Sequence, residues 1–156
     1  MRGRGLLFAL LVLCQGARAD SVAFQIWPNR SADDMVACRI ELRAGQIVAI
    51  ETQGSGAPPG LIMRWPVRKD EEAAVLHALR ALISGDLPGV DPYKTRMPPP
   101  PFVMVTWSST VNDRLLTGLY LQNGLELPPI LAGLIDTVLP GGACYSRITA
   151  PAAAPG

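Results

Sequence analysis

Histidine is the side chain most often used for proton transfer near neutral pH, and this sequence of 156 residues contains a single one, His77. A serine or cysteine nucleophile needs a neighbouring base that a third group holds in place. His77 falls on a predicted helix, on the side away from the apolar stripe, so it is expected to face water. The sequence therefore does not predict a Ser-His-Asp or Cys-His mechanism.

Carboxylates offer a second route to catalysis, because two converging acids can act as general acid and general base. The adjacent pairs Asp33-Asp34 and Glu71-Glu72 fall in a predicted turn and at a predicted helix start. Neighbouring side chains point apart, so turn formation and attraction to the helix dipole explain these pairs better. The chain contains no phosphate-binding glycine motif and no G-x-S-x-G motif. We predict no catalytic residue and no cofactor.

Residues 1–19 have the pattern of a secretory signal peptide. Arg2 and Arg4 precede a short apolar run, and Ala17 and Ala19 supply the small residues of a cleavage site. The run is too short for a transmembrane helix, which needs about 20 apolar residues. Cleavage would remove three of the 14 basic residues and leave 11 against 13 acidic ones. We expect export to the periplasm or secretion, no stable membrane insertion afterwards, and no nucleic-acid partner.

The cysteines fit an exported protein. Cys14 falls within the predicted signal peptide, which leaves Cys38 and Cys144 as an even pair. Such a pair in an oxidising compartment is typical of a disulfide, here joining an early strand to the chain after the last helix. Two cysteines and one histidine at these spacings do not form a familiar zinc site, so no metal ligand is predicted.

The most distinctive segment is proline-rich. Residues 86–101 read DLPGVDPYKTRMPPPP and include six prolines. A stiff extended loop loses little conformational entropy on binding, so such a segment suits protein recognition. The candidate binding side chains, in loop 93–101 and just after it, are Tyr93, Lys94, Arg96, Met97, Pro98 and Phe102. The alternative interpretation is a stiff connection that crosses one end of a sheet.

The order of a helix, Gly85-Asp86-Leu87, an irregular loop, a strand, a hairpin and a late cysteine resembles the bacterial subtilisin-inhibitor family. In that family the loop between the helix and the next strands enters the protease. The resemblance implies a protease inhibitor whose matching loop runs from Lys94 to Pro99. The family's two disulfides need four cysteines, whereas this chain keeps two after the signal peptide, so membership is not assigned.

Alternating apolar residues predict strands, and turn residues separate them. The predicted strands cover residues 21–27, 35–43, 47–52, 61–65, 102–107, 114–122 and 125–127. For the hairpin between the second and third strands we predict a three-residue loop at residues 44–46. That register places Leu42 beside Val48 and groups the larger apolar side chains on one face.

Two amphipathic helices complete the prediction. The first has Asp70 as its N-cap and ends before Gly85, and the second begins at Pro128-Pro129 and ends before Pro140. Short connections between strands favour antiparallel pairing. We predict an α+β fold with a mostly antiparallel sheet of about six to seven short strands, two helices packed on one face, and one disulfide. Residues 20–148 form a single domain, followed by a disordered tail at 149–156.

Function is predicted mainly by exclusion. We expect a small exported, non-catalytic protein that binds another envelope or extracellular protein and is itself a monomer. The first alternative is a secreted protease inhibitor acting through loop 93–101. Further alternatives are a small-ligand carrier, which needs an apolar cavity between the sheet and the helices, and an enzyme whose polar groups the sequence does not reveal.

Overall fold

The computed structural model describes residues 19–54, 56, 58–89, 97–142 and 144. Most of the predicted signal peptide, the centre of the proline-rich segment and the predicted tail at 149–156 lie outside the described residues. Within the described part, no helix is long and apolar enough to cross a membrane.

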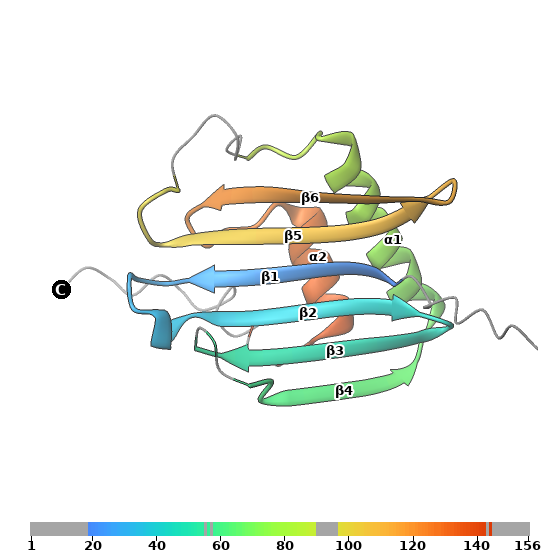
Figure 1. Ribbon diagram of the computed structural model, residues 1–156, viewed down its shortest axis with the longest axis horizontal. Coiled ribbons are helices and arrows are strands. Elements are labelled where there is room, and N and C mark those ends of the chain that lie inside the picture. Colours follow the sequence, from blue (N-terminus) through green and yellow to red (C-terminus); the bar gives the residue numbers. More distant parts are fainter. Residues whose placement is uncertain (1–18, 55, 57, 90–96, 143, 145–156) are drawn as a thin grey trace, which may run out of the picture.

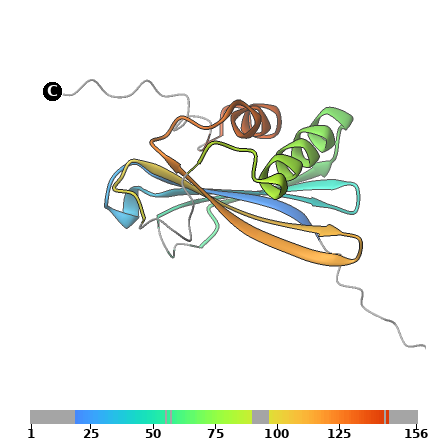
Figure 2. The same cartoon turned by 90° about the horizontal axis from the view of Figure 1, so that it is seen from above.

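One antiparallel sheet forms the body of the molecule, with strands in the order β4-β3-β2-β1-β5-β6 (Figure 1). The strands are β1 Asp20–Trp27, β2 Val36–Arg43, β3 Gln46–Gln53, β4 Leu61–Pro66, β5 Phe102–Val111 and β6 Arg114–Asn123. Helices α1 Lys69–Ser84 and α2 Pro129–Val138 both cover the same face (Figure 2). The predicted α+β class is therefore confirmed, with six strands.

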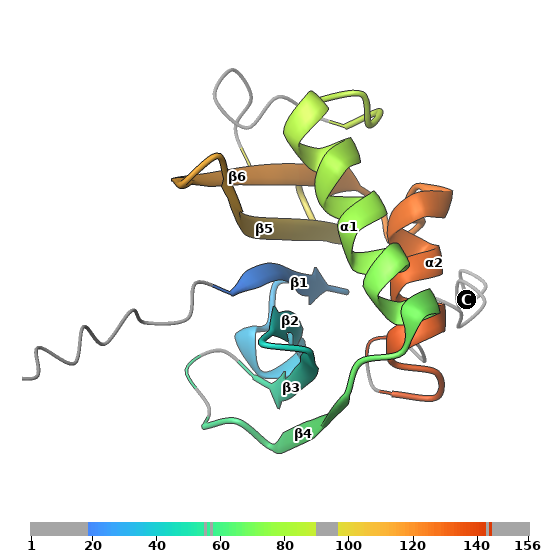
Figure 3. The same ribbon diagram turned by 90° about the vertical axis from the view of Figure 1, so that its right-hand side faces the viewer.

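The core lies between the sheet and the helices. On the central strand β1, Val22, Phe24 and Ile26 are fully buried and point toward the helices. Side chains alternate between the two faces of a strand, so the residues between them point to the opposite, uncovered face. Helix α1 runs along the helix-covered side of the sheet from the β4 edge toward β6 (Figure 3), and it lies between β4 and β5 in the sequence. The buried helix residues are Val75, Ala78, Leu79 and Leu82 of α1 and Leu131, Leu134, Ile135 and Val138 of α2.

The predicted register of the β2–β3 hairpin is wrong. Arg43 pairs with Gln46 and Leu42 with Ile47, so the loop contains two residues, Ala44 and Gly45. Both have positive φ, 48° and 76°. Two-residue turns with two positive φ angles match the twist of the flanking strands, and this local preference outweighs the grouping of large apolar side chains. Ile47 therefore faces the helices, and Val48 faces the uncovered side of the sheet.

The β5–β6 hairpin differs from the prediction in the same way. The predicted strands 102–107 and 114–122 leave residues 108–113 as the turn, but β5 continues to Val111 and the turn contains only Asn112 and Asp113. Their φ angles are 48° and 61°, which these two residue types tolerate better than most. The predicted strand at 125–127 is also absent from the described sheet. Instead Leu127 is buried in the core cluster, at the point where the chain passes from β6 to α2.

Helix α1 begins earlier than predicted. Its N-cap is Arg68 instead of Asp70, because the Glu71 side chain accepts a hydrogen bond from the Arg68 backbone N–H at 2.8 Å. A glutamate at this third helical position satisfies an N–H at the start of the helix. The predicted end is confirmed, since Gly85 has a left-handed φ of 73°.

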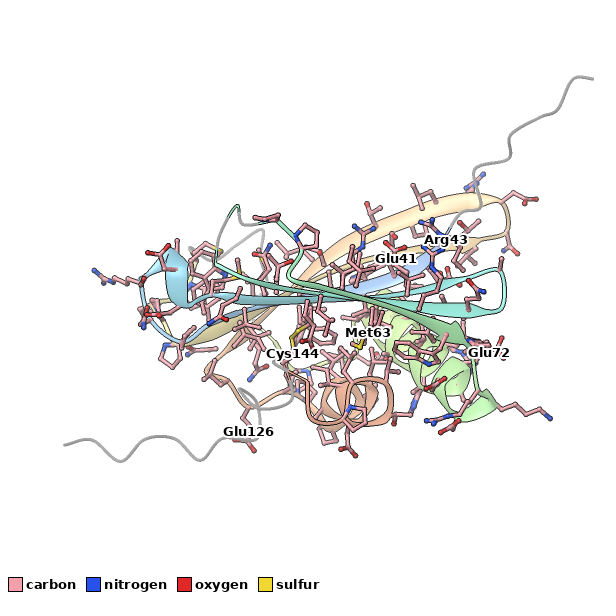
Figure 4. The ribbon with its side chains drawn as sticks, turned by 90° about the horizontal axis from the view of Figure 1, so that it is seen from below. Glu41, Arg43, Met63, Glu72, Glu126 and Cys144 are labelled. Atoms are coloured by element: carbon pink, nitrogen blue, oxygen red, sulfur yellow. A yellow bond between two sulfur atoms is a disulfide. The ribbon has the colours of Figure 1, made fainter. Side chains whose placement is uncertain are left out.

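The predicted disulfide is confirmed. Cys38 of β2 and Cys144, which follows α2, are joined with their Cα atoms 6.2 Å apart. Both residues are buried on the helix side of the sheet, and Figure 4 shows Cys144 on that side. The bond therefore ties the segment after α2 to the middle of the sheet.

Gly133 offers a direct test of helix α2. It is exposed in the interior of the helix, and a Cβ atom added there meets nothing within 4 Å. Because glycine destabilises a helix interior by roughly 0.5–1 kcal/mol relative to alanine, Gly133→Ala should raise the free energy of unfolding by about that amount in urea denaturation. Gly118→Ala is the contrasting control. An added Cβ atom would collide with the Trp107 ring, so this variant should lower the free energy of unfolding. A lower urea midpoint for Gly133→Ala would contradict the exposed position of this residue.

Candidate functional site

The predicted recognition loop is only partly described. Tyr93, Lys94 and Arg96 lie outside the described residues. Met97 is exposed and Pro98 is half-buried, so both remain accessible to a partner.

Phe102 has a packing role. It is the first residue of β5 and is only 5% exposed. Its ring stacks on that of Trp27, the last residue of β1, with centroids 5.8 Å apart and an interplanar angle of 13°. The two residues are direct neighbours across the β1–β5 ladder. This aromatic pair fixes the point where the proline-rich segment enters the sheet.

Both described ends of the proline-rich segment are hydrogen-bonded to the end of β6. The Tyr120 hydroxyl oxygen lies 2.7 Å from the Pro88 carbonyl oxygen, and the Gly124 N–H donates to the Pro101 carbonyl oxygen at 2.9 Å. A Cβ atom at Gly89 would collide with the Tyr120 ring, so the chain passes directly against β6. Pro88 and Pro101 are therefore both held in place by contacts with the end of β6.

Tyr120 remains protonated at any ordinary pH. Its hydroxyl oxygen also lies 2.6 Å from Gln122 Oε1, and its single proton can be donated to only one of the two acceptors at a time. Burial raises the pKa of Tyr120 to about 12. The contribution of the neutral phenol to stability is therefore present below pH 10 and is lost as the pH rises from 10 through 12.

A groove of about 1040 Å³ opens at this end of the sheet. It lies between the ends of the proline-rich segment, the exit of β6 and the start of α2. Its lining includes Pro88, Pro101, Asn123, Leu125, Glu126, Pro128 and Ala132. The carbonyls of Pro88, Pro101 and Pro128 already accept hydrogen bonds within the protein, so these prolines contribute mainly apolar surface, and Asn123 adds a side-chain amide.

A second candidate site lies on the uncovered face of the sheet. Glu41 of β2 is buried there, and its two carboxylate oxygens each contact an arginine of the same strand. Arg39 Nε lies 2.9 Å from Oε1, and Arg43 Nη2 lies 3.1 Å from Oε2. Figure 4 shows Glu41 and Arg43 on the side of the sheet opposite the helices. The Arg39 and Arg43 side chains are about half exposed, at 53% and 48%.

Beside Arg39 is a depression of about 480 Å³ lined mainly by small residues. Its hydroxyl-bearing residues come from three strands, β1, β5 and β6, and the Ser21 and Ser108 hydroxyl oxygens lie 2.8 Å apart. Its lining includes Ser21, Ala23, Arg39, Thr106, Ser108 and Thr117, together with the larger Trp107 and Leu119. No motif in the sequence indicates this site. The sequence shows that Arg39, Glu41 and Arg43 alternate with apolar residues. Which residues of β1 and β5 lie beside them depends on the order of the strands in the sheet.

No family model matches this chain, and no curated protein or solved structure is significantly similar to it.

The catalytic candidates do not converge. His77 is exposed on α1, as predicted. Asp33 and Asp34 lie in a short 3-10 turn, whereas Glu71 is buried and accepts a hydrogen bond from Trp65 Nε1 at 3.0 Å. Among the described residues, no group of three histidine, cysteine, aspartate or glutamate side chains could hold a metal ion. The two cavities can bind and orient a ligand through shape, acceptors and arginines.

Proposed function

We propose that this protein is a small exported, non-catalytic module that binds another exported protein. The observation that carries the proposal is the groove of about 1040 Å³ where both described ends of the proline-rich segment are hydrogen-bonded to the end of β6. The Cys38–Cys144 disulfide supports export, because such bonds persist mainly in oxidising compartments.

The chemistry of the groove favours an extended polypeptide segment as its occupant. Its prolines form rigid apolar walls, and the exposed Asn123 side-chain amide adds a donor and an acceptor that can pair with the backbone of an extended chain. Leu125 and Ala132 add apolar surface, and Glu126 is exposed at the rim. We therefore expect a partner segment that carries apolar side chains and one basic residue facing Glu126.

The proposal is tested by blocking the groove. Ala132→Arg places a long side chain into it from α2, while Ala73→Arg makes the same change at an exposed position of α1 outside it. The tagged mature protein is used to capture partners from the envelope and medium fractions of its source, and the captured partner is then purified. By titration calorimetry, Ala132→Arg should weaken binding at least about tenfold and Ala73→Arg should leave it unchanged.

Two results would contradict this proposal. One is a wild-type protein that captures no specific partner, and the other is a partner that binds the Ala132→Arg variant as tightly as the wild type. A protease that is inhibited by the wild type but not after replacement of Arg96 and Met97 would instead favour the inhibitor alternative. The small-ligand carrier needs an apolar cavity between the sheet and the helices, whereas the depression beside Arg39 lies on the opposite face of the sheet.

A further inference from the structure

Charge is divided unequally between the two layers of the molecule. On the uncovered face, the register places Arg39 and Arg43 of β2 and Arg64 of β4, with Glu41 as the one carboxylate among the described strands. Three arginines against one glutamate give this face a formal excess of two positive charges. The helices on the other side carry Asp70, Glu71, Glu72 and Asp136 against Lys69 and Arg80.

Glu41 fixes the arginines in place. It lies opposite Ser21 on one side and Val48 on the other, and its side chain is only 8% exposed. Each of its oxygens contacts a different guanidinium, so Arg39 and Arg43 are both held against the face of the sheet. A guanidinium group has five N–H donors, which leaves donors on each arginine for a ligand.

The depression beside Arg39 supplies further polar groups in a fixed arrangement. Cross-strand pairing places Ser21 against Ser108, and Ser108 against Thr117, so their side chains form a row across β1, β5 and β6. Ser21 and Ser108 are themselves hydrogen-bonded. These short hydroxyl side chains leave room above the sheet, and together with Arg39 they suit a carboxylate that enters from the uncovered side.

We propose that the uncovered face is a second binding surface, distinct from the groove, that recognises an acidic polypeptide segment through Arg39, Arg43 and the adjacent hydroxyl row. The segment lies across β2, β1 and β5, with one carboxylate in the depression and another on Arg43. The excess of positive charge selects an acidic partner, and the fixed guanidinium groups provide paired hydrogen bonds to carboxylates. This inference does not depend on the partner of the groove.

The test uses a peptide of six glutamates flanked by Gly-Ser, with the corresponding glutamine peptide as the uncharged probe. Binding to the mature protein is followed by NMR and calorimetry at low and at physiological salt. The glutamate peptide should bind with one-to-one stoichiometry, shift amide signals of β1, β2 and β5, and bind more weakly at higher salt. Arg39→Gln and Arg43→Gln should each weaken binding about tenfold. Arg80→Gln removes an equal charge from the exposed side of α1 and should have no effect.

The Glu41→Gln variant distinguishes a binding site with fixed arginines from nonspecific electrostatic attraction. The substitution makes the face more positive, so a diffuse charge effect would tighten binding of the acidic peptide. The proposal requires the opposite, because the guanidinium groups lose the carboxylate that holds them. Binding should therefore weaken severalfold. Circular dichroism checks that the Glu41→Gln variant is folded. If it is not folded, the test rests on Arg39→Gln and Arg43→Gln, which change half-exposed side chains.

Three results would overturn the proposal. The first is tighter binding by Glu41→Gln, and the second is an equal loss of affinity in Arg80→Gln and Arg39→Gln. The third is equal binding of the glutamate and glutamine peptides. If the glutamate peptide binds as proposed while Ala132→Arg leaves its affinity unchanged, the two surfaces are independent.

Discussion

Replacing Cys38 and Cys144 together by alanine is expected to lower the free energy of unfolding by about 2–5 kcal/mol. The bond joins residues 106 positions apart and so closes most of the described chain into one loop. In the chain-entropy description, a loop of about 100 residues gives a stabilisation near the top of that range. The folded state adds to the effect, because the bond anchors the segment after α2 to buried strand β2.

The measurement is urea denaturation of the oxidised wild type and the double variant. The wild type in the presence of a reducing agent should unfold at nearly the same urea concentration as the double variant, since both lack the bond. The single variant Cys144→Ala should also unfold at nearly this urea concentration, because it too lacks the bond. Equal midpoints for the oxidised wild type and the double variant would show that the disulfide contributes nothing to stability.

The fold class, the helices and the disulfide could be predicted because each depends on local pattern or on parity. The apolar stripe around Val75 and Leu79 predicts the buried face of α1 directly, and Gly85 marks its end. The wrong predictions concern mainly hairpin geometry, beside the N-cap of α1 and the strand expected at 125–127. Whether the loop after Arg43 contains two residues or three depends on the backbone angles of Ala44 and Gly45, and no apolar pattern encodes those angles.

The uncovered face could be predicted only in part. The period-two pattern of β2 places Arg39, Glu41 and Arg43 on one side of that strand. Ser21 and Ser108 are 87 positions apart, and they meet only because β1 lies between β2 and β5. Strand order results from packing of the whole chain, so the row of hydroxyls beside Arg39 is not visible in the sequence.

The second large effect is expected for Phe24→Ala, which should lower the free energy of unfolding by about 3–5 kcal/mol. Phe24 is fully buried on β1, opposite Cys38 on one side and Val105 on the other. Removing the ring at this central position leaves a cavity that the flanking strands cannot close. Gln25→Ala, on the uncovered face of the same strand, is the matched control and should change stability by less than about 1 kcal/mol. Comparable losses in the two variants would contradict the assignment of the two faces.

Phe24 and the disulfide should also be coupled. Phe24 and Cys38 are direct neighbours in the β1–β2 ladder and belong to one buried cluster with Cys144. Substitutions at contacting residues are often not additive, whereas those at distant sites usually are. A double-mutant cycle combining Phe24→Ala with the loss of the disulfide should therefore give an interaction free energy of about 0.5–3 kcal/mol. The same cycle with Gly133→Ala, on the exposed side of α2, should give a value near zero. A zero value in both cycles would mean that the aromatic ring and the disulfide stabilise the sheet independently, despite their direct pairing.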